Sequence, residues 1–180
     1  MQRTIKYIVL TLFLAVTLVS CNDGVSLQRY YVDNQEEVSF ITQDIPISMV
    51  KIDKTNFTEE QTEAFNSVSK LNFLGYKTDD TNTETFKAEL AKVKTILSDE
   101  KYQDLIEFSD RGNKIIVKYI GTDEEADEVI VFGTAKEFGF GIVRILGDDM
   151  SPDKMVTLVS AMQNAKVDES EIQSFMNFFK

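Results

Sequence analysis

The sequence contains no histidine and no tryptophan, and it has one cysteine and two prolines among 180 residues. Without histidine there is no imidazole base near neutral pH, which excludes the usual catalytic triads and dyads. Scarce cysteine and absent histidine also remove the common ligand sets for zinc and copper. Paired carboxylates that cleave sugars need a cleft lined with aromatic rings, and tryptophan is missing. We therefore expect no enzymatic activity, no cofactor and no metal.

Glycine is also sparse, with 8 residues, and it forms no phosphate-binding motif. Gly133, Gly139 and Gly141 do not fit the dinucleotide fingerprint, and no P-loop pattern occurs. Glycines in strand-like segments more often mark bulges or close backbone approach. The densest acidic cluster, residues 123–128, lacks the ligand spacing and the turn glycine of a calcium loop. We expect this cluster to be a solvated hairpin loop.

Charge is unbalanced, with 19 basic and 30 acidic residues and a net charge of −11. Such a chain is repelled by the phosphates of nucleic acids, which bind clustered lysine and arginine. It is repelled by anionic lipid surfaces for the same reason. We expect no nucleic-acid partner and attribute most of the acidic residues to solvated faces.

The single cysteine ends the most apolar stretch of the chain. Arg3 and Lys6 precede an apolar run of 13 residues, 7–19. As a helix this run spans about 20 Å, less than the ~30 Å hydrocarbon core of a bilayer. A basic start, a short apolar run and small residues at its end are typical of a secretory signal peptide. We expect residues 1–20 to be this signal.

The last four residues of this stretch, Leu18-Val19-Ser20-Cys21, resemble a bacterial lipobox. The resemblance implies cleavage between Ser20 and Cys21, a diacylglycerol on the sulfur and a fatty acid such as palmitate on the new amine. Several acyl chains on one residue hold a soluble domain at a membrane. The alternatives are an ordinary secretory signal with an incidental cysteine, or an N-terminal membrane anchor. The expected location is the bacterial cell envelope, at the outer membrane, facing either periplasm or exterior.

After Cys21 no cysteine follows, so the mature chain contains no disulfide and depends on its core. Residues 21–36 are mostly polar without a clear period, which is typical of a tether. Residues 37–180 are long enough for one domain with a sizeable core. Two tyrosines in the tether, Tyr30 and Tyr31, are expected to dock on that domain.

Periodicity predicts the elements of this domain. A short strand broken by Pro46 precedes a helix with the capping box Thr58–Gln61, a buried strand at 71–76 and a helix at 84–98 that begins near Thr81. From residue 103 the period changes to that of β-hairpins, and Ser151 and Pro152 begin another helix. The expected fold class is α+β, a single domain in which helices pack on one face of an antiparallel β-meander sheet.

A last helix is expected from Asp168, with an apolar stripe that includes Phe175 and Phe179. These rings either close the core or, if exposed, form a patch for a partner. Phe178 lies off the stripe, so it is the ring expected to stay exposed if the stripe packs into the core. Phe175, Phe178 and Phe179 are therefore the candidate partner contacts.

Residues 104–162 resemble the domain of unknown function 4252 family of lipoproteins from Bacteroidetes-type bacteria. The resemblance rests on NKIIVKYI, EVIVF, GIVRILGDDM and SPDKMVTLV, which begin at Asn113, Glu128, Gly141 and Ser151. It implies an exported, lipid-anchored α+β domain, and it transfers no catalytic residue. We expect a non-catalytic interaction or structural module, attached to the bilayer through acylated Cys21 and in contact with an envelope protein. The alternative is a carrier of a small or lipidic ligand in a pocket between sheet and helices.

Overall fold

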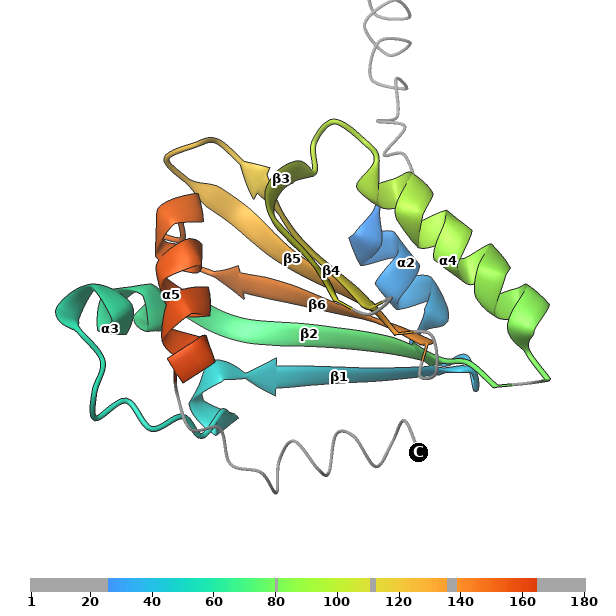
Figure 1. Cartoon of the computed structure of the whole chain (residues 1–180), viewed down its shortest axis with the longest axis horizontal. Helices are drawn as coiled ribbons and strands as arrows, with labels where there is room; N and C mark the ends of the chain where they lie inside the picture. Colours follow the sequence, from blue (N-terminus) through green and yellow to red (C-terminus); the bar gives the residue numbers. More distant parts are fainter. Residues whose placement is uncertain (1–25, 80, 111–112, 136–138, 165–180) are drawn as a thin grey trace, which may run out of the picture.

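The computed structural model describes residues 26–79, 81–110, 113–135 and 139–164. Its centre is one six-stranded antiparallel sheet in the order β1-β2-β6-β5-β4-β3 (Figure 1). The strands are β1 (Phe40–Pro46), β2 (Val68–Lys77), β3 (Gln103–Asp110), β4 (Asn113–Gly121), β5 (Ala126–Ala135) and β6 (Gly139–Gly147). The helices are α2 (Leu27–Asn34), the short 3-10 helix η1 (Ile47–Met49), α3 (Glu59–Asn66), α4 (Thr83–Leu97) and α5 (Pro152–Asn164). The expected α+β class is confirmed.

Strands β3 to β6 form the meander predicted from the hairpin pattern, since each pairs with the next along the chain. The sheet then continues through β2, which pairs with β6 from Val68–Gly147 to Lys77–Gly139, and ends at β1. Helix α4 lies in the connection that crosses from β2 to the opposite edge of the sheet at β3. The sheet therefore has two edges, β1 and β3.

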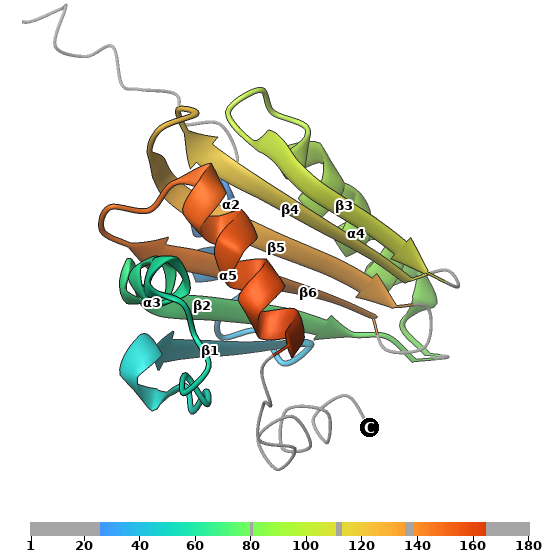
Figure 2. The same ribbon diagram turned by 60° about the vertical axis from the view of Figure 1, so that its left-hand side comes forward.

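The helices lie on both faces of the sheet, so the prediction of one covered face was wrong. Figure 2 shows α3 and α5 in front of the sheet and α2 and α4 behind it. Two separate cores result, and alternate residues of one strand enter different cores: Leu74 belongs to one and Leu71 to the other. A strand that is apolar on both sides must be covered on both sides. We call the two sides the α4 face and the α5 face.

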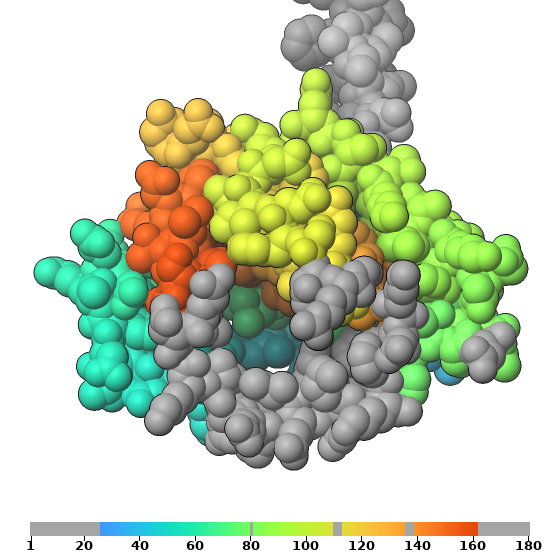
Figure 3. All heavy atoms as spheres, in the orientation of Figure 1, coloured from blue at the N-terminus to red at the C-terminus, as the bar shows by residue number. Residues whose placement is uncertain are grey.

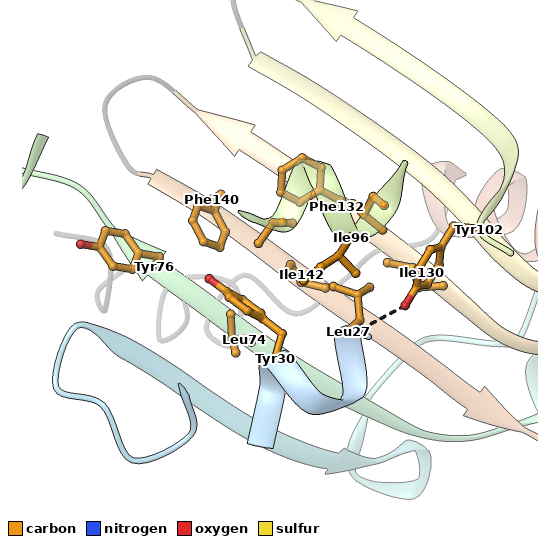
Figure 4. Packing of buried hydrophobic residues seen from close by; sticks show 12 residues of the cluster. Leu27, Tyr30, Leu74, Tyr76, Ile96, Tyr102, Ile130, Phe132, Phe140 and Ile142 are labelled. Atoms are coloured by element: carbon orange, nitrogen blue, oxygen red, sulfur yellow. Dashed lines mark hydrogen bonds between the residues drawn. The ribbon is translucent and has the colours of Figure 1, made fainter. Parts of the chain in front are cut away.

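The core of the α4 face is aromatic (Figure 4). Tyr76 stacks on Phe140 with ring centroids 5.6 Å apart, and Phe40 meets Tyr76 edge to face at 4.9 Å. Both arrangements are favoured by the ring quadrupoles. Leu74, Val93 and the other members of this core are buried between the sheet and helices α2 and α4. This layer is closed by direct side-chain contact.

Helix α2 corrects the predicted tether, because residues 27–34 fold onto the α4 face. Leu27 and Tyr30 are buried, and the Leu27 amide donates to the Tyr102 hydroxyl at 3.0 Å. The Tyr30 hydroxyl donates to Glu89 Oε2 at 2.8 Å. Burial and this carboxylate raise the pKa of Tyr30 well above its ordinary value. The docking expected for Tyr30 and Tyr31 is confirmed for Tyr30, which enters the core, and Tyr31 packs against it.

The helix starts follow the predicted caps in two of three cases. Thr58 and Gln61 form a complete capping box at α3, and Ser151 Oγ accepts from the Lys154 amide at 3.2 Å at α5. Helix α4 instead begins after Asn82, because Asp79 binds both the amide and the hydroxyl of Thr81 in a turn. A threonine whose side chain already serves a turn is not available as a cap.

The acidic cluster at 123–128 is not a solvated loop throughout, since Glu128 lies in β5 and is buried. Its two carboxylate oxygens accept from Arg144 Nε at 2.6 Å and Nη2 at 2.8 Å. Arg144 stands on β6, beside β5 in the sheet. A bidentate pair of this kind fixes geometry as well as charge. Each of these two charged side chains would be costly to bury alone, and the pair provides each with a partner of opposite charge.

Replacing Arg144 with methionine should lower the free energy of unfolding by about 3–5 kcal/mol, because Glu128 then stays buried without a partner. The double variant Glu128→Leu/Arg144→Met leaves no unpaired charge and should recover most of this loss. Urea unfolding followed by circular dichroism measures both. Equal midpoints for Arg144→Met and the unchanged protein would contradict the structural role given to this pair.

Candidate functional site

The α5 face contains a cavity of about 440 Å³ between the sheet and the elements η1, α3 and α5. Figure 3 shows this side of the molecule hollowed next to α5. Every described residue that lines the cavity is apolar. They are Ile47, Val50, Ile52, Phe65, Val68, Leu71, Val117, Val129, Val131, Val143, Ile145, Met155, Leu158 and Val159.

The floor of the cavity follows from the alternation of the central strands. Val129 and Val131 of β5 lie next to Ile145 and Val143 of β6 in the strand register. Side chains two residues apart point to the same face, so these four form one continuous apolar floor. Branched side chains are short, and a floor built mainly from them leaves space below a helix that longer residues would fill.

The roof of the cavity is made by helices that contact each other as well as the sheet. Phe65 of α3 and Met155 of α5 are both buried and both line the cavity. Lys154 Nζ lies 3.2 Å from Glu63 Oε1 of α3 and 2.7 Å from Asp149 Oδ2. The hydrogen bond to Asp149 is the largest cause of the raised pKa of Lys154. Both acids are mostly exposed, so these contacts orient the two helices and add little stability.

A group of hydrogen-bonded polar side chains lies at the β4 end of this floor, next to Val129. Tyr119 lies opposite Val129 in the register, and its hydroxyl donates to Asp123 Oδ1 at 3.0 Å. This hydrogen bond is the main cause of the raised pKa of Tyr119. Gln103 donates to the Gly121 carbonyl at 2.7 Å and places its own oxygen 3.1 Å from the tyrosine hydroxyl. The polar network is thus internally satisfied and directs no free donor into the cavity.

The chemistry of the cavity follows from its lining. A charged ligand would lose its hydration without gaining a partner from the lining residues that the structure describes, which costs several kcal/mol. An uncharged apolar group gains about 25 cal/mol for each Å² of surface removed from water. The arrangement can therefore bind an apolar group, and the described lining offers no acid, base or nucleophile for catalysis.

The residues proposed as sites from the sequence lie outside the described part of the chain. These are Ser20 and Cys21 at the expected cleavage position and the rings Phe175, Phe178 and Phe179. Among the described residues, no helix is long and apolar enough to cross a membrane. Nor does any group of three or more acidic residues in the described ranges have a geometry that could hold a metal ion.

From the sequence, a pocket between sheet and helices was expected only in the alternative function and without any named lining residue, although a signal for these residues exists. Odd-numbered valines in β5 and β6 alternate with even-numbered residues that fill the other core. When the residues of β5 and β6 are assigned to the two faces of the sheet, short branched residues lie on one face and large rings such as Phe132 and Phe140 lie on the other. A face built from short side chains indicates less complete filling.

A family model described as a domain of unknown function (DUF4252) matches residues 30–158. The match begins inside α2 and ends inside α5, so it includes the whole sheet and both helical layers. The family resemblance seen in the sequence is thereby confirmed. No curated protein and no solved structure matches the chain.

Met155→Ala should lower the free energy of unfolding by about 2–5 kcal/mol, because it removes buried contacts and enlarges an existing void. Val156→Ala is the matched control on the same helix, since Val156 is 39 % exposed while Met155 is 2 % exposed. The control should change stability by less than about 0.5 kcal/mol. Urea unfolding of both variants tests whether α5 is anchored through the roof of the cavity, and equal losses would contradict it.

Proposed function

The chain belongs to the DUF4252 family, and from that premise we propose that it is a non-catalytic, lipid-anchored binding protein of the bacterial envelope that holds an apolar ligand. The ligand class is an uncharged apolar chain or ring, such as the acyl part of a lipid. The binding site is the cavity of the α5 face. One observation carries the proposal: all of the described lining of this cavity is apolar.

The size and the lining together favour a ligand over an incidental packing defect. Ligand pockets are commonly of about 300–1,000 Å³ and mostly apolar. The cavity, at about 440 Å³, falls within that range, whereas packing voids rarely exceed a water molecule. An apolar group bound in this cavity would make dispersion contacts with the branched side chains of its lining.

The proposed anchor suits such a binding role. An acylated Cys21 would hold the domain beside a bilayer, and the net charge of −11 argues against attachment through anionic headgroups. The first described residue of the domain, Ser26, follows Cys21 by only a few positions. The anchor would therefore keep the domain close to a source of apolar ligands. We place the protein at the outer membrane as part of the same proposal.

A second candidate function is a docking module for another envelope protein. It is favoured by Phe108 and Ile115, which are 45 % and 44 % exposed on adjacent strands at the β3 edge. Exposed apolar side chains next to a sheet edge are typical of interaction surfaces. A pull-down from envelopes with the lipidated protein, compared with its Phe108→Ser variant, tests this role. Recovery of one protein that is lost with the variant would support it.

Val131→Phe should abolish binding of the neutral probe N-phenyl-1-naphthylamine, because the larger ring occupies the floor of the cavity. Titration of the full-length protein followed by probe fluorescence should show at least a tenfold weaker affinity. Ile115→Phe is the matched control, since Ile115 lies on the same face but outside the cavity lining, and it should bind as the unchanged protein does. Thermal melting by circular dichroism verifies that both variants are folded. Equal affinity of the two variants would exclude the cavity as the binding site.

Cys21→Ser should release the protein from membranes. The diacylglycerol of a lipoprotein is attached to the cysteine sulfur through a thioether, and serine has no sulfur to form this bond. Fractionation of cells grown with radiolabelled palmitate measures both location and label. The expected result is an unlabelled protein in the soluble fraction. A variant that stays with the membrane and remains labelled would show that the anchor lies elsewhere.

A further inference from the structure

Three glycines form a straight row across the α5 face. Gly141 of β6 stands between Gly75 of β2 and Gly133 of β5 in the strand register. A Cβ atom built on Gly141 would lie 3.3 Å from the ring of Phe73, and one built on Gly133 would lie 4.0 Å from Cγ1 of Ile115. Strands are about 4.8 Å apart, so the row spans about 10 Å and carries no side chain of its own, while the ring of Phe73 lies against Gly141.

The glycine row continues the apolar floor of the cavity. Val131 and Val143 line the cavity, and Gly133 and Gly141 are the residues two positions away from them towards the hairpin end of the sheet. That is a step of about 7 Å along the strands. The row is bounded by Ile115 on β4, and Phe108 lies beyond it on β3. Gly133 and Gly141 do not belong to the described cavity lining, so the row lies beside the cavity and outside it.

The chain itself supplies an occupant of matching chemistry. Residues 165–180 follow α5, and the sequence in this segment places Ile172, Phe175 and Phe179 at helical spacing. In Figures 1 and 2 the last turn of α5 lies beside β1, on the same face as the glycine row. Sixteen residues reach about 24 Å as a helix and about 55 Å when extended. Either length is sufficient to reach a strip that begins one step beyond the cavity.

We infer that residues 165–180 cover the glycine row, with phenylalanine rings packed over Gly133 between the side chains of Phe73 and Ile115. A tethered segment binds its own domain at a high effective concentration, which favours it over a separate molecule. Large rings against glycines bury the most apolar area at the closest approach. This inference does not rest on the proposed ligand, and its test uses no ligand.

The absence of tryptophan makes a sharp experiment possible, because one introduced tryptophan is the only indole in the protein. In the full-length Phe175→Trp protein, emission should be shifted to the blue, and acrylamide should quench it several-fold less than in Gln173→Trp. Gln173 is the matched control because it lies off the apolar spacing. Equal emission and equal quenching of the two proteins would overturn the inference.

A second substitution locates the contact. Gly133 has no positive φ, and its added Cβ meets only an ordinary contact, so the backbone accepts a side chain there. Gly133→Leu in the Phe175→Trp protein should move the emission to that of the exposed control, while Gly133→Ala should change it little. Unchanged emission in a Gly133→Leu protein with normal thermal melting would overturn the inference. Blue-shifted emission that is lost on dilution would assign the row to a second copy and would equally overturn it.

Discussion

The sheet is apolar on both sides, and the rest of the structure depends on covering it twice. Strands β2, β5 and β6 send Leu74, Ile130 and Ile142 to the α4 face and Leu71, Val129 and Ile145 to the α5 face. Each uncovered side would expose a continuous apolar surface to water at about 25 cal/mol for each Å². Helices from both ends of the chain are recruited for this purpose, which is why α2 and α5 both belong to the domain.

The two coverings differ in how completely side chains fill them, and the proposed binding site lies on the less filled side. On the α4 face, aromatic rings fill the layer, and the hydroxyls of Tyr102 and Tyr30 are hydrogen-bonded to the Leu27 amide and to Glu89. Buried hydrogen bonds of this kind favour one arrangement of the packed elements. On the α5 face, short valines line a cavity, and a row of glycines continues its floor. A ligand or segment can be accommodated there without disturbing the layer that holds the domain together.

Local patterns predicted much of the fold, and what they missed required tertiary information. The hairpins from residue 103, the capping box at Thr58 and the start of α5 at Ser151 are determined by neighbours in sequence. The role of Glu128 was missed because its partner Arg144 lies on another strand, and a run of acids alone reads as solvated. Helix α2 was missed because 8 residues with a polar composition form a helix only when Leu27 and Tyr30 find a core to enter.

The alternation of apolar residues in the strands indicates helices on both faces, but two charged residues in the outer strands led to the prediction of one covered face. Lys118 and Glu107 suggested one polar face, but Lys118 bonds the Tyr102 carbonyl at 2.9 Å and pairs with Asp104 at the β3 edge. A lysine can extend its charged end to a sheet edge while its stem lies on an apolar layer. One charged residue therefore does not make a face polar. The number of apolar positions on each side decides how many layers are needed, and in this sheet that number requires two.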